Sequence, residues 1–319
     1  MIEAKNLTKR YGDKTAVDDL SFSVQPGKVT GFVGPNGAGK STTMRLLLGL
    51  DHLDGGDATI DGRHYQDLPQ PLRVVGALLE AKAVHPGRSA YHHLLCLAQT
   101  QGIGKKRVEE VLQLVGLHDV ARRRAGGFSL GMGQRLGLAA ALLGDPSVLV
   151  LDEPVNGLDP EGVIWIRTLM KQLAAEGRTV FVSSHLMNEM AVTAEHLIVI
   201  GRGRLIADCP MAEFIERGRK QSVLVRSPDA ERLTEAIALE GGEVTRHGAD
   251  ELSVANMDAV RVGEIAAAGG HVLYEVSLRR ASLEEAFVEL TRESVEYAAA
   301  GGTGAIGDHA APAIKGGAE

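Results

Sequence analysis

Apolar and polar residues alternate over residues 2–8 and 15–24, and this period of two predicts antiparallel strands with one face in solvent. Short apolar segments predict further strands, which we place at GKVTGFVG, RVVGALLE, SVLVLDEP (147–154), 178–183 and 195–208. Helical patterns fill the stretches between them, at 40–50, at 160–175 and, with glycine breaks, over 89–144. Strands that alternate with helices predict a parallel sheet that is covered on both faces.

The pattern changes after about residue 220. Strands are predicted at SVLVR, EVTRH, ELSVA and HVLYEVS, with helices at 228–240 and 257–268. This β-α-β-β-α-β order is the ferredoxin-like arrangement, and a last helix is expected at 282–291. We therefore predict two folded units, 1–218 and 220–296. The Gly/Ala-rich tail, 298–319, has almost no core-forming residues, so we expect it to be disordered.

Composition narrows the class of partner. The chain has 319 residues, a net charge of −7 and an aromatic content of 4%. Nucleic-acid-binding proteins carry basic patches and often stacking aromatics, so we expect no nucleic-acid partner. The basic run Arg122-Arg123-Arg124 is interpreted as a solvated helix end. Neither cysteine belongs to a CxxC or Cys/His pattern, which argues against a zinc site. Cys96, which stands among apolar residues, is expected in the core.

Two features that place proteins in or across membranes are missing from the sequence. No apolar N-terminal segment typical of a signal peptide is present, and no run of about 18 apolar residues occurs. We therefore expect nothing in this chain to span a bilayer. If the protein acts on a membrane process, a partner must supply the membrane part.

The segment GPNGAGKST fits the pattern G-x-x-x-x-G-K-[ST] of a phosphate-binding loop. A predicted strand precedes it and a predicted helix follows, which is the context that such a loop requires. Its glycines let the backbone wrap an anion, and the helix N-terminus favours negative charge. The predicted phosphate-binding residues are Gly34, Pro35, Asn36, Gly37, Ala38, Gly39, Lys40, Ser41 and Thr42, with Lys40 on the β- and γ-phosphates and the Ser41 hydroxyl on Mg²⁺.

Polar groups follow two of the predicted buried strands. Asp152 and Glu153 end the run VLVLDEP, and His185 comes just after VFVSSHL. Open α/β sheets bind their ligands at the carboxyl ends of their strands. Asp152 is therefore a candidate partner of Mg²⁺, and Glu153 a candidate to orient or deprotonate an attacking water. His185 is a candidate to contact a γ-phosphate or to hold the water-orienting group.

The order of these motifs resembles the nucleotide-binding subunit of ABC transporters over about residues 2–216. Residues 220–290 resemble, more by position than by motif, the accessory domain of exporter ATPases of the daunorubicin- and bacitracin-resistance type, which work with ABC-2 type permeases. The resemblance implies an α/β P-loop NTPase fold. It has a RecA-like core, an antiparallel β subdomain and a helical subdomain at about 81–145, with a small α+β domain after it.

The resemblance also assigns residues that the pattern alone does not. Tyr11 matches the aromatic residue that stacks on adenine, and Asp159 in VNGLDPEG faces a second subunit. Glu80 stands where the family usually has a glutamine that contacts Mg²⁺ and the attacking water, so it is a candidate ligand of both nucleotide and metal. We interpret this acid as a feature of the subgroup. The segment KAVHPGRSAYHHL is the candidate contact with the membrane subunit.

A second glycine-rich turn, GFSLGMGQR, matches the family signature with two departures. Leu130 replaces a glycine and Met132 a glutamine, whereas Ser129 and Gly131 agree with the signature. The resemblance implies that Ser129 and Gly131 cap an ATP molecule bound to the phosphate loop of a second subunit. We therefore expect two subunits, in a homodimer or a mixed pair, to close on two ATP molecules.

The expected activity is hydrolysis of ATP, with Mg²⁺, by a subunit that drives a separate integral-membrane permease from the cytoplasmic face of the membrane. Glu153, Lys40 and His185 are the candidate catalytic residues. The accessory region favours an exporter of a drug, antibiotic or lipid-like compound. Other readings stay open from the sequence: a soluble ATPase of translation, a DNA-repair or chromosome ATPase, and a binding module that nucleotide only regulates.

Overall fold

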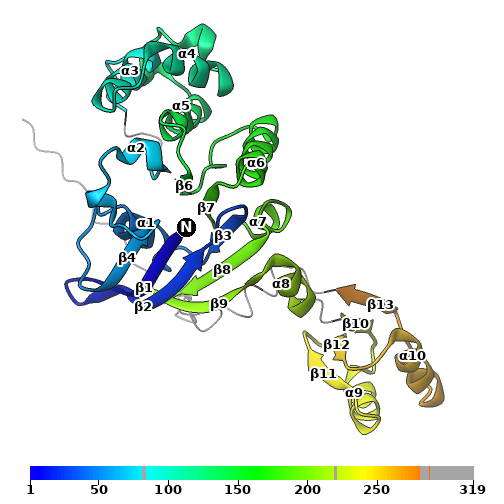
Figure 1. Cartoon of the computed structure of the whole chain (residues 1–319). Helices are drawn as coiled ribbons and strands as arrows, with labels where there is room; N and C mark the ends of the chain where they lie inside the picture. Colours follow the sequence, from blue (N-terminus) through cyan, green and yellow to red (C-terminus); the bar gives the residue numbers. More distant parts are fainter. Residues whose placement is uncertain (81–83, 219–220, 281–286, 288–319) are drawn as a thin grey trace, which may run out of the picture.

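A computed structural model describes residues 1–80, 84–218, 221–280 and 287. Its centre is a six-stranded sheet in the order β5-β6-β7-β3-β8-β9 (Figure 1). The first five strands in this order are parallel, and only β9 is antiparallel. The strands are β3 (Val29–Val33), β5 (Val75–Leu78), β6 (Val148–Leu151), β7 (Thr179–Ser184), β8 (His196–Gly201) and β9 (Arg204–Pro210). Every residue of β3, β6 and β7 is buried, as their continuous apolar sequences require.

An antiparallel sheet in the order β2-β1-β4 packs against this core. It consists of β1 (Ile2–Tyr11), β2 (Lys14–Val24) and β4 (Gly55–Ile60). Its alternating apolar residues form one buried face, so the predicted half-solvated strands are confirmed. Phe22 of β2 lies 5.6 Å from both Phe32 of β3 and Phe181 of β7, between ring centroids, and these three rings join the two sheets.

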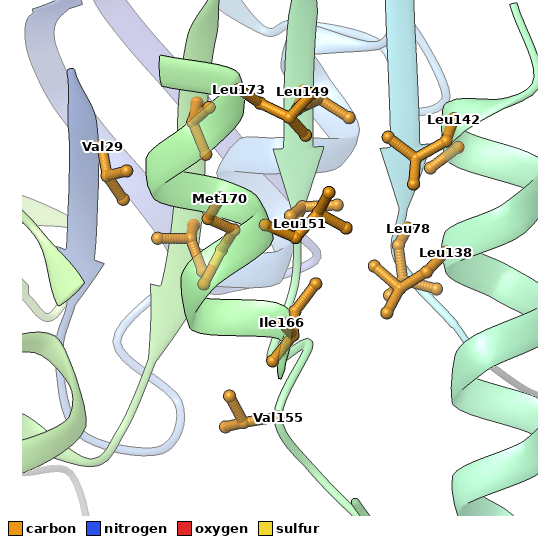
Figure 2. Packing of buried hydrophobic residues seen from close by; sticks show 14 of the residues in the cluster. Val29, Leu78, Leu138, Leu142, Leu149, Leu151, Val155, Ile166, Met170 and Leu173 are labelled. Carbon is orange, nitrogen blue, oxygen red and sulfur yellow. The ribbon is translucent and has the colours of Figure 1, made fainter. Parts of the chain in front are cut away.

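Helices cover the central sheet and form a separate helical segment. Ile166, Met170 and Leu173 of α6 face Leu149 and Leu151 of β6 (Figure 2). The helices of the first 218 residues are α1 (Lys40–Leu47), α2 (Pro71–Val74), α3 (Ala90–Thr100), α4 (Lys105–Leu114), α5 (Leu130–Leu142), α6 (Pro160–Ala175), α7 (Met187–Thr193) and α8 (Met211–Gly218). Short 3₁₀ turns lie at Tyr65–Asp67, His118–Val120 and Ala125–Gly127.

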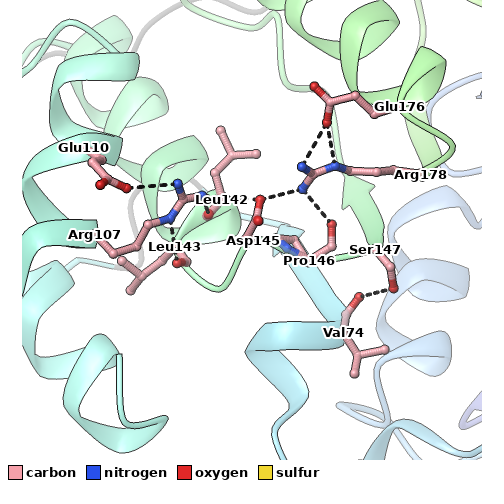
Figure 3. A network of polar contacts seen from close by, with 10 residues as sticks. All are labelled: Val74, Arg107, Glu110, Leu142, Leu143, Asp145, Pro146, Ser147, Glu176 and Arg178. Carbon is pink, nitrogen blue, oxygen red and sulfur yellow. Dashed lines mark hydrogen bonds and ion pairs between the residues drawn. The ribbon is translucent and has the colours of Figure 1, made fainter. Parts of the chain in front are cut away.

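A polar network attaches the helical segment α3–α5 to the sheet (Figure 3). Arg107 of α4 donates to the carbonyl oxygens of Leu142 (2.9 Å) and Leu143 (3.2 Å) at the end of α5. Asp145, two residues after Leu143, pairs with Arg178 at 2.8 Å, just before β7 begins. The end of α5 is therefore fixed to the sheet by charged groups as well as by apolar packing.

Residues 221–280 form a second, four-stranded antiparallel sheet in the order β11-β12-β10-β13. Its elements are β10 (Gln221–Arg226), α9 (Ala230–Leu239), β11 (Glu243–Arg246), β12 (Glu251–Ala255), α10 (Ala259–Ala268) and β13 (Glu275–Arg280). They follow the β-α-β-β-α-β order that the sequence predicts, around a core of their own. The helix expected at 282–291 and the tail at 298–319 lie outside the described residues, apart from Phe287, which is buried.

Three local predictions were wrong. The strand expected over 73–80 begins only at Val75, because Pro71 starts a short helix before it. The last strand of the second sheet begins at Glu275 rather than His271. Cys96 is exposed. The buried face of α3 is formed by Ala90, Leu94 and Ala98, at a spacing of four, and Cys96 falls between them on another side.

No helix in the described part of the chain is long and apolar enough to cross a membrane.

The contact between Gly144 and α2 gives a test of this packing. A Cβ atom at Gly144 would overlap the carbonyl oxygen of Leu72, whereas one at Gly127 would meet no atom within 4 Å. Because backbone must move to make room, we expect Gly144→Ala to lower the free energy of unfolding by about 3 kcal/mol. Gly127→Ala should change it by less than about 0.5 kcal/mol. Urea denaturation of both variants measures this, and equal stabilities would contradict the close approach.

Candidate functional site

The loop Gly34–Thr42 connects β3 to α1 with the geometry of an anion-binding turn. Gly37 and Gly39 have φ angles of 81° and 104°, in the region that favours glycine. A Cβ atom at Gly34 would lie 2.5 Å from the carbonyl oxygen of Ile200, so backbone approach also excludes side chains there. The first N–H groups of α1 have no acceptor within the helix. They are available to an anion in the loop.

Lys40, the first residue of α1, lies over this loop. Its Nζ donates to the carbonyl oxygens of Gly34 (2.7 Å) and Pro35 (3.3 Å), and the residue is only 8% exposed. Burial lowers the pKa of Lys40, whereas the negative charges of Glu153 and Asp152 raise it. The ammonium group is thus held where phosphate oxygens would replace the two carbonyl partners.

The loop forms one wall of a pocket of about 580 Å³. The opposite side comes from the residues that follow β6 and β7, so segments far apart in the sequence meet there. The described residues that line it are Tyr11, Lys14, Ala16, Asn36, Gly37, Ala38, Gly39, Lys40, Ser41, Thr42, Glu153, Asn156 and His185.

Glu153 and His185 meet at the carboxyl ends of β6 and β7. His185 Nδ1 lies 2.9 Å from Glu153 Oε2 and donates to this carboxylate. Asp152 does not line the pocket. The hydroxyl of Ser183 donates to its Oδ1, and its own N–H donates to the carbonyl oxygen of Leu78 at 2.7 Å. The ends of β6 and β7 therefore meet through the Glu153–His185 contact, and Glu153 lines the pocket.

Tyr11 is held at the pocket by the ion pair between Asp51 and Arg45. Its hydroxyl donates to Asp51 Oδ2 at 2.7 Å, and Arg45 of α1 donates to both oxygens of Asp51, at 2.7 and 2.9 Å. These bonds lower the pKa of Asp51 from 3.8 to about 2, chiefly through Arg45. The Tyr11 ring is 49% exposed, which leaves a face for a planar ligand.

Three predicted site residues stand away from this pocket at helix starts. Ser129 caps α5 by accepting from the N–H of Met132 at 3.2 Å, and Asp159 caps α6 by accepting from that of Gly162 at 3.1 Å. Gly131 packs so closely on the turn after β6 that a Cβ atom would lie 2.9 Å from the carbonyl oxygen of Gly157. None of the three is among the described residues that line the pocket.

Glu80 also lies outside the residues that line the pocket. It follows β5 by two residues, as Glu153 follows β6, and the ends of these strands are paired through Leu78 and Leu151. Within the described residues, no group of three or more His, Cys, Asp or Glu side chains could hold a metal ion. Mg²⁺ in nucleotide sites usually takes only one or two protein ligands beside phosphates and waters. The Ser41 hydroxyl, which lines the pocket, and the Asp152 carboxylate, which does not, are oxygen donors of the kind that Mg²⁺ takes.

Sequence reasoning missed several residues of the site. Lys14, Ala16 and Asn156 line the pocket, and Asp51 supports Tyr11. Two others, Ser183 and Gln134, contact the backbone of Glu153. Ser183 and Gln134 belong to segments that contain predicted motifs, but no pattern indicates which backbone groups their side chains reach.

A phosphate loop between a strand and a helix, in a parallel sheet where another strand, β6, ends in two acids, defines a P-loop nucleotide-binding protein. The family model described as "ABC transporter" matches residues 17–156. A second model, described as a domain of unknown function (DUF8746), matches residues 221–284. The first model covers both the phosphate loop and the two acids.

Known relatives extend the match over most of the chain. An uncharacterized ABC transporter ATP-binding protein of Bacillus subtilis, YhcH, is 37% identical over 300 residues, which are 93% of this chain and 97% of that protein. The bacitracin transport ATP-binding protein BcrA of Bacillus licheniformis is 41% identical over 223 residues, 69% and 73% of the two chains. A solved dimeric ATP-binding cassette in a post-hydrolysis state, bound to ADP and Pi, has a TM-score of 0.61 and 26% identity, and the match covers 66% of this chain and 99% of that one.

The chain therefore belongs to the ATP-binding proteins of ABC transporters. The predicted P-loop fold is confirmed, and the chain is an ATP-binding ATPase subunit of this family. The reading as a soluble ATPase of translation or repair is not favoured, since the relatives are transporter subunits.

The support of Tyr11 predicts a pH-dependent contribution to stability. Asp51 has a lower pKa in the folded chain than in the unfolded one, so it stabilises the fold above pH 3.8 and loses this effect as the pH falls through about 2. We expect Asp51→Asn to cost about 1 kcal/mol or less at pH 6, because the pair is partly solvated. Urea denaturation at pH 6 and pH 2.5 should show the deficit shrinking. A loss of stability in Asp51→Asn that is the same at both pH values would contradict the role of Asp51. An equal loss in Asp13→Asn would contradict it as well.

Proposed function

We propose that this chain hydrolyses ATP as one of two nucleotide-binding subunits of an exporter, with Mg²⁺ as cofactor. The observation that carries the proposal is one pocket in which the phosphate loop faces the Glu153–His185 pair. The substrate class is inferred from bacitracin transport by the relative BcrA, so we propose an antibiotic-like compound. Residues 221–280 are the accessory domain of this subunit.

Different residues of the site bind the phosphates, the adenine and the metal ion. The backbone N–H groups of Gly37–Thr42 and the Lys40 ammonium hold the phosphates, and Tyr11 offers its exposed ring face to the adenine. Ser41 and Asp152 would hold Mg²⁺, with Glu80 at the adjacent strand end, and the ion would supply charge neutralisation at the phosphates.

The Glu153 carboxylate orients the attacking water and accepts its proton, and His185 holds this carboxylate toward the phosphate loop. Most of the catalysis is positioning and electrostatic stabilisation, as is general for phosphoryl transfer. The pocket presents the groups for this: one ammonium, the amides of a helix start and one carboxylate.

A second copy of the chain completes each site in this proposal. Ser129 and Gly131 stand at the start of α5, where the helix dipole favours an anion, yet neither is among the described residues that line the pocket of their own chain. Leu130 between them is 53% exposed. Two chains related by a twofold axis would bring this helix start onto the partner's ATP, with Asp159 at the same interface. ATP then acts as a ligand that favours the closed pair.

The membrane permease would dock on the helical segment. An apolar groove of about 530 Å³ lies between residues 84–86 and the start of α5, lined by Val84, Pro86, Ala125, Gly126, Phe128, Ser129, Leu130, Gly133 and Leu136. Two backbone hydrogen bonds join its walls, from Ala125 to Arg88 and from Gly126 to Pro86.

Four exposed arginines, Arg88, Arg122, Arg123 and Arg124, lie within three residues in sequence of Pro86 or Ala125, which line this groove. None of them pairs with a carboxylate among the described residues. On a chain of net charge −7, this favours an amphipathic segment with acidic residues as the docking partner. In this proposal the subunit lies on the cytoplasmic face of the membrane.

Removal of the Glu153 charge tests the closed pair. Glu153→Gln keeps the shape of the side chain but cannot accept a proton, so hydrolysis should fall by at least about 100-fold while ATP still binds. We expect this variant to elute as a dimer from gel filtration with ATP and Mg²⁺. Adding Lys40→Ala should return it to a monomer, because the phosphates lose their cation. A Glu153→Gln chain that stays monomeric with ATP would refute the dimer.

Charge reversal tests the docking surface. We expect Arg122→Glu combined with Arg123→Glu to reduce co-purification of an integral-membrane protein from detergent-solubilised membranes by at least about tenfold. ATP hydrolysis by the free chain should stay unchanged. Lys171→Glu, which reverses an exposed charge on α6, serves as the control. Equal recovery with both variants would show that the arginines are not part of the interface.

A further inference from the structure

We propose that Ser183 and Gln134 are positioning residues that hold Glu153 in the conformation from which it acts on water. The proposal rests on the proposed ATP hydrolysis and adds two residues to it, on β7 and on α5. Together they bind the backbone of Glu153 on both sides of its Cα atom.

Glu153 needs such support because its backbone is strained. Its φ angle is 48°, in the left-handed region that residues with a Cβ atom rarely adopt. Strained residues persist only where their surroundings fix them, and they gather at functional sites. In this conformation the carboxylate reaches His185 and the pocket wall.

Ser183 fixes the amide side of Glu153. The paired register of β6 and β7 places Leu151 opposite Val182, so Ser183 comes to lie beside Asp152. The buried Ser183 Oγ accepts the N–H of Glu153 at 2.9 Å and donates its own proton to Asp152 Oδ1. A backbone N–H can only donate, so the direction of both bonds is determined. One hydroxyl therefore sets the positions of both acids.

Gln134 fixes the carbonyl side. This buried residue of α5 donates from Nε2 to the carbonyl oxygens of Glu153 (3.2 Å) and Pro154 (2.9 Å). An amide nitrogen has two protons, and both are used here. Gln134 lies one turn after Gly131, so it connects the helix start that would contact the partner's ATP to Glu153 of its own chain.

The test separates an effect on Glu153 from general loss of structure. We expect Ser183→Ala to lower kcat by at least about tenfold, because small misplacements of a catalytic group are costly. ATP affinity, measured by equilibrium dialysis without Mg²⁺, should stay within about twofold. Ser184→Ala is the matched control, since the side chain of this buried neighbour on β7 accepts a hydrogen bond from the N–H of Leu186 and makes none to Asp152 or Glu153 in the described structure. Ser183→Thr, which keeps the hydroxyl, should restore at least half of the rate.

Gln134→Met gives a second, independent measurement. It keeps the length of the side chain, loses both donors and does not contact Asp152. We expect the same loss in kcat with unchanged ATP affinity. In a Glu153→Gln background the loss should largely vanish, because a residue that acts through the carboxylate has nothing left to position.

Two results would overturn the proposal: Ser183→Ala behaving like Ser184→Ala, or Gln134→Met lowering the rate equally with and without the Glu153 carboxylate. Failure of the wild-type chain to hydrolyse ATP would overturn the proposed function itself. That outcome is distinguishable from the two results above, which compare the rates of variants with that of an active wild-type chain.

Discussion

The parallel pairing of β3, β7 and β6 is the constraint on which the site depends. Val33 pairs with Ser184 and Leu151 with Val182, so the segments after these three strands leave the sheet at one edge. The phosphate loop, the Asp152–Glu153 pair and His185 come together there although they are up to 150 residues apart in sequence. Burial of all three strands makes this register costly to change, since a slip would expose apolar side chains and bury the acids.

The helix α5 connects this edge to the surfaces where other subunits would act. Its start lies at the signature turn and lines the apolar groove. Gln134, in its first turns, donates to the backbone of Glu153. The carbonyl group of Leu142 at its end accepts a hydrogen bond from Arg107. Packed interiors transmit displacement because they have little free space. Within the proposed function, a displacement of α5 on permease docking or on binding of the partner's nucleotide would reach Glu153 through Gln134.

The sequence predicts the central elements well because each has a strong local cause. The helix at 160–175 matches α6 residue for residue, with Asp159 as its cap and Pro160 at its first position. Lys40, Glu153 and His185 were found from strand ends and loop spacing. The hydrogen bond between Tyr11 and Asp51, and those of Ser183 and Gln134 to the backbone of Glu153, are not predicted from the sequence. Such contacts depend on three-dimensional packing, which leaves no periodic pattern in the sequence. Cys96 was misplaced because apolar neighbours in sequence do not identify the buried side of a helix.

The two glycine-rich turns differ in backbone conformation, and this explains their different roles. In the first, Gly37 and Gly39 have positive φ angles and the chain curls so that amides converge on one point. In the second, Gly131 and Gly133 lie within α5 and are absent from the positive-φ residues, so the turn is an ordinary helix start capped by Ser129. A single helix start offers too few amides to hold a triphosphate alone. It can cap one that another loop already holds, and this supports a site shared between two chains.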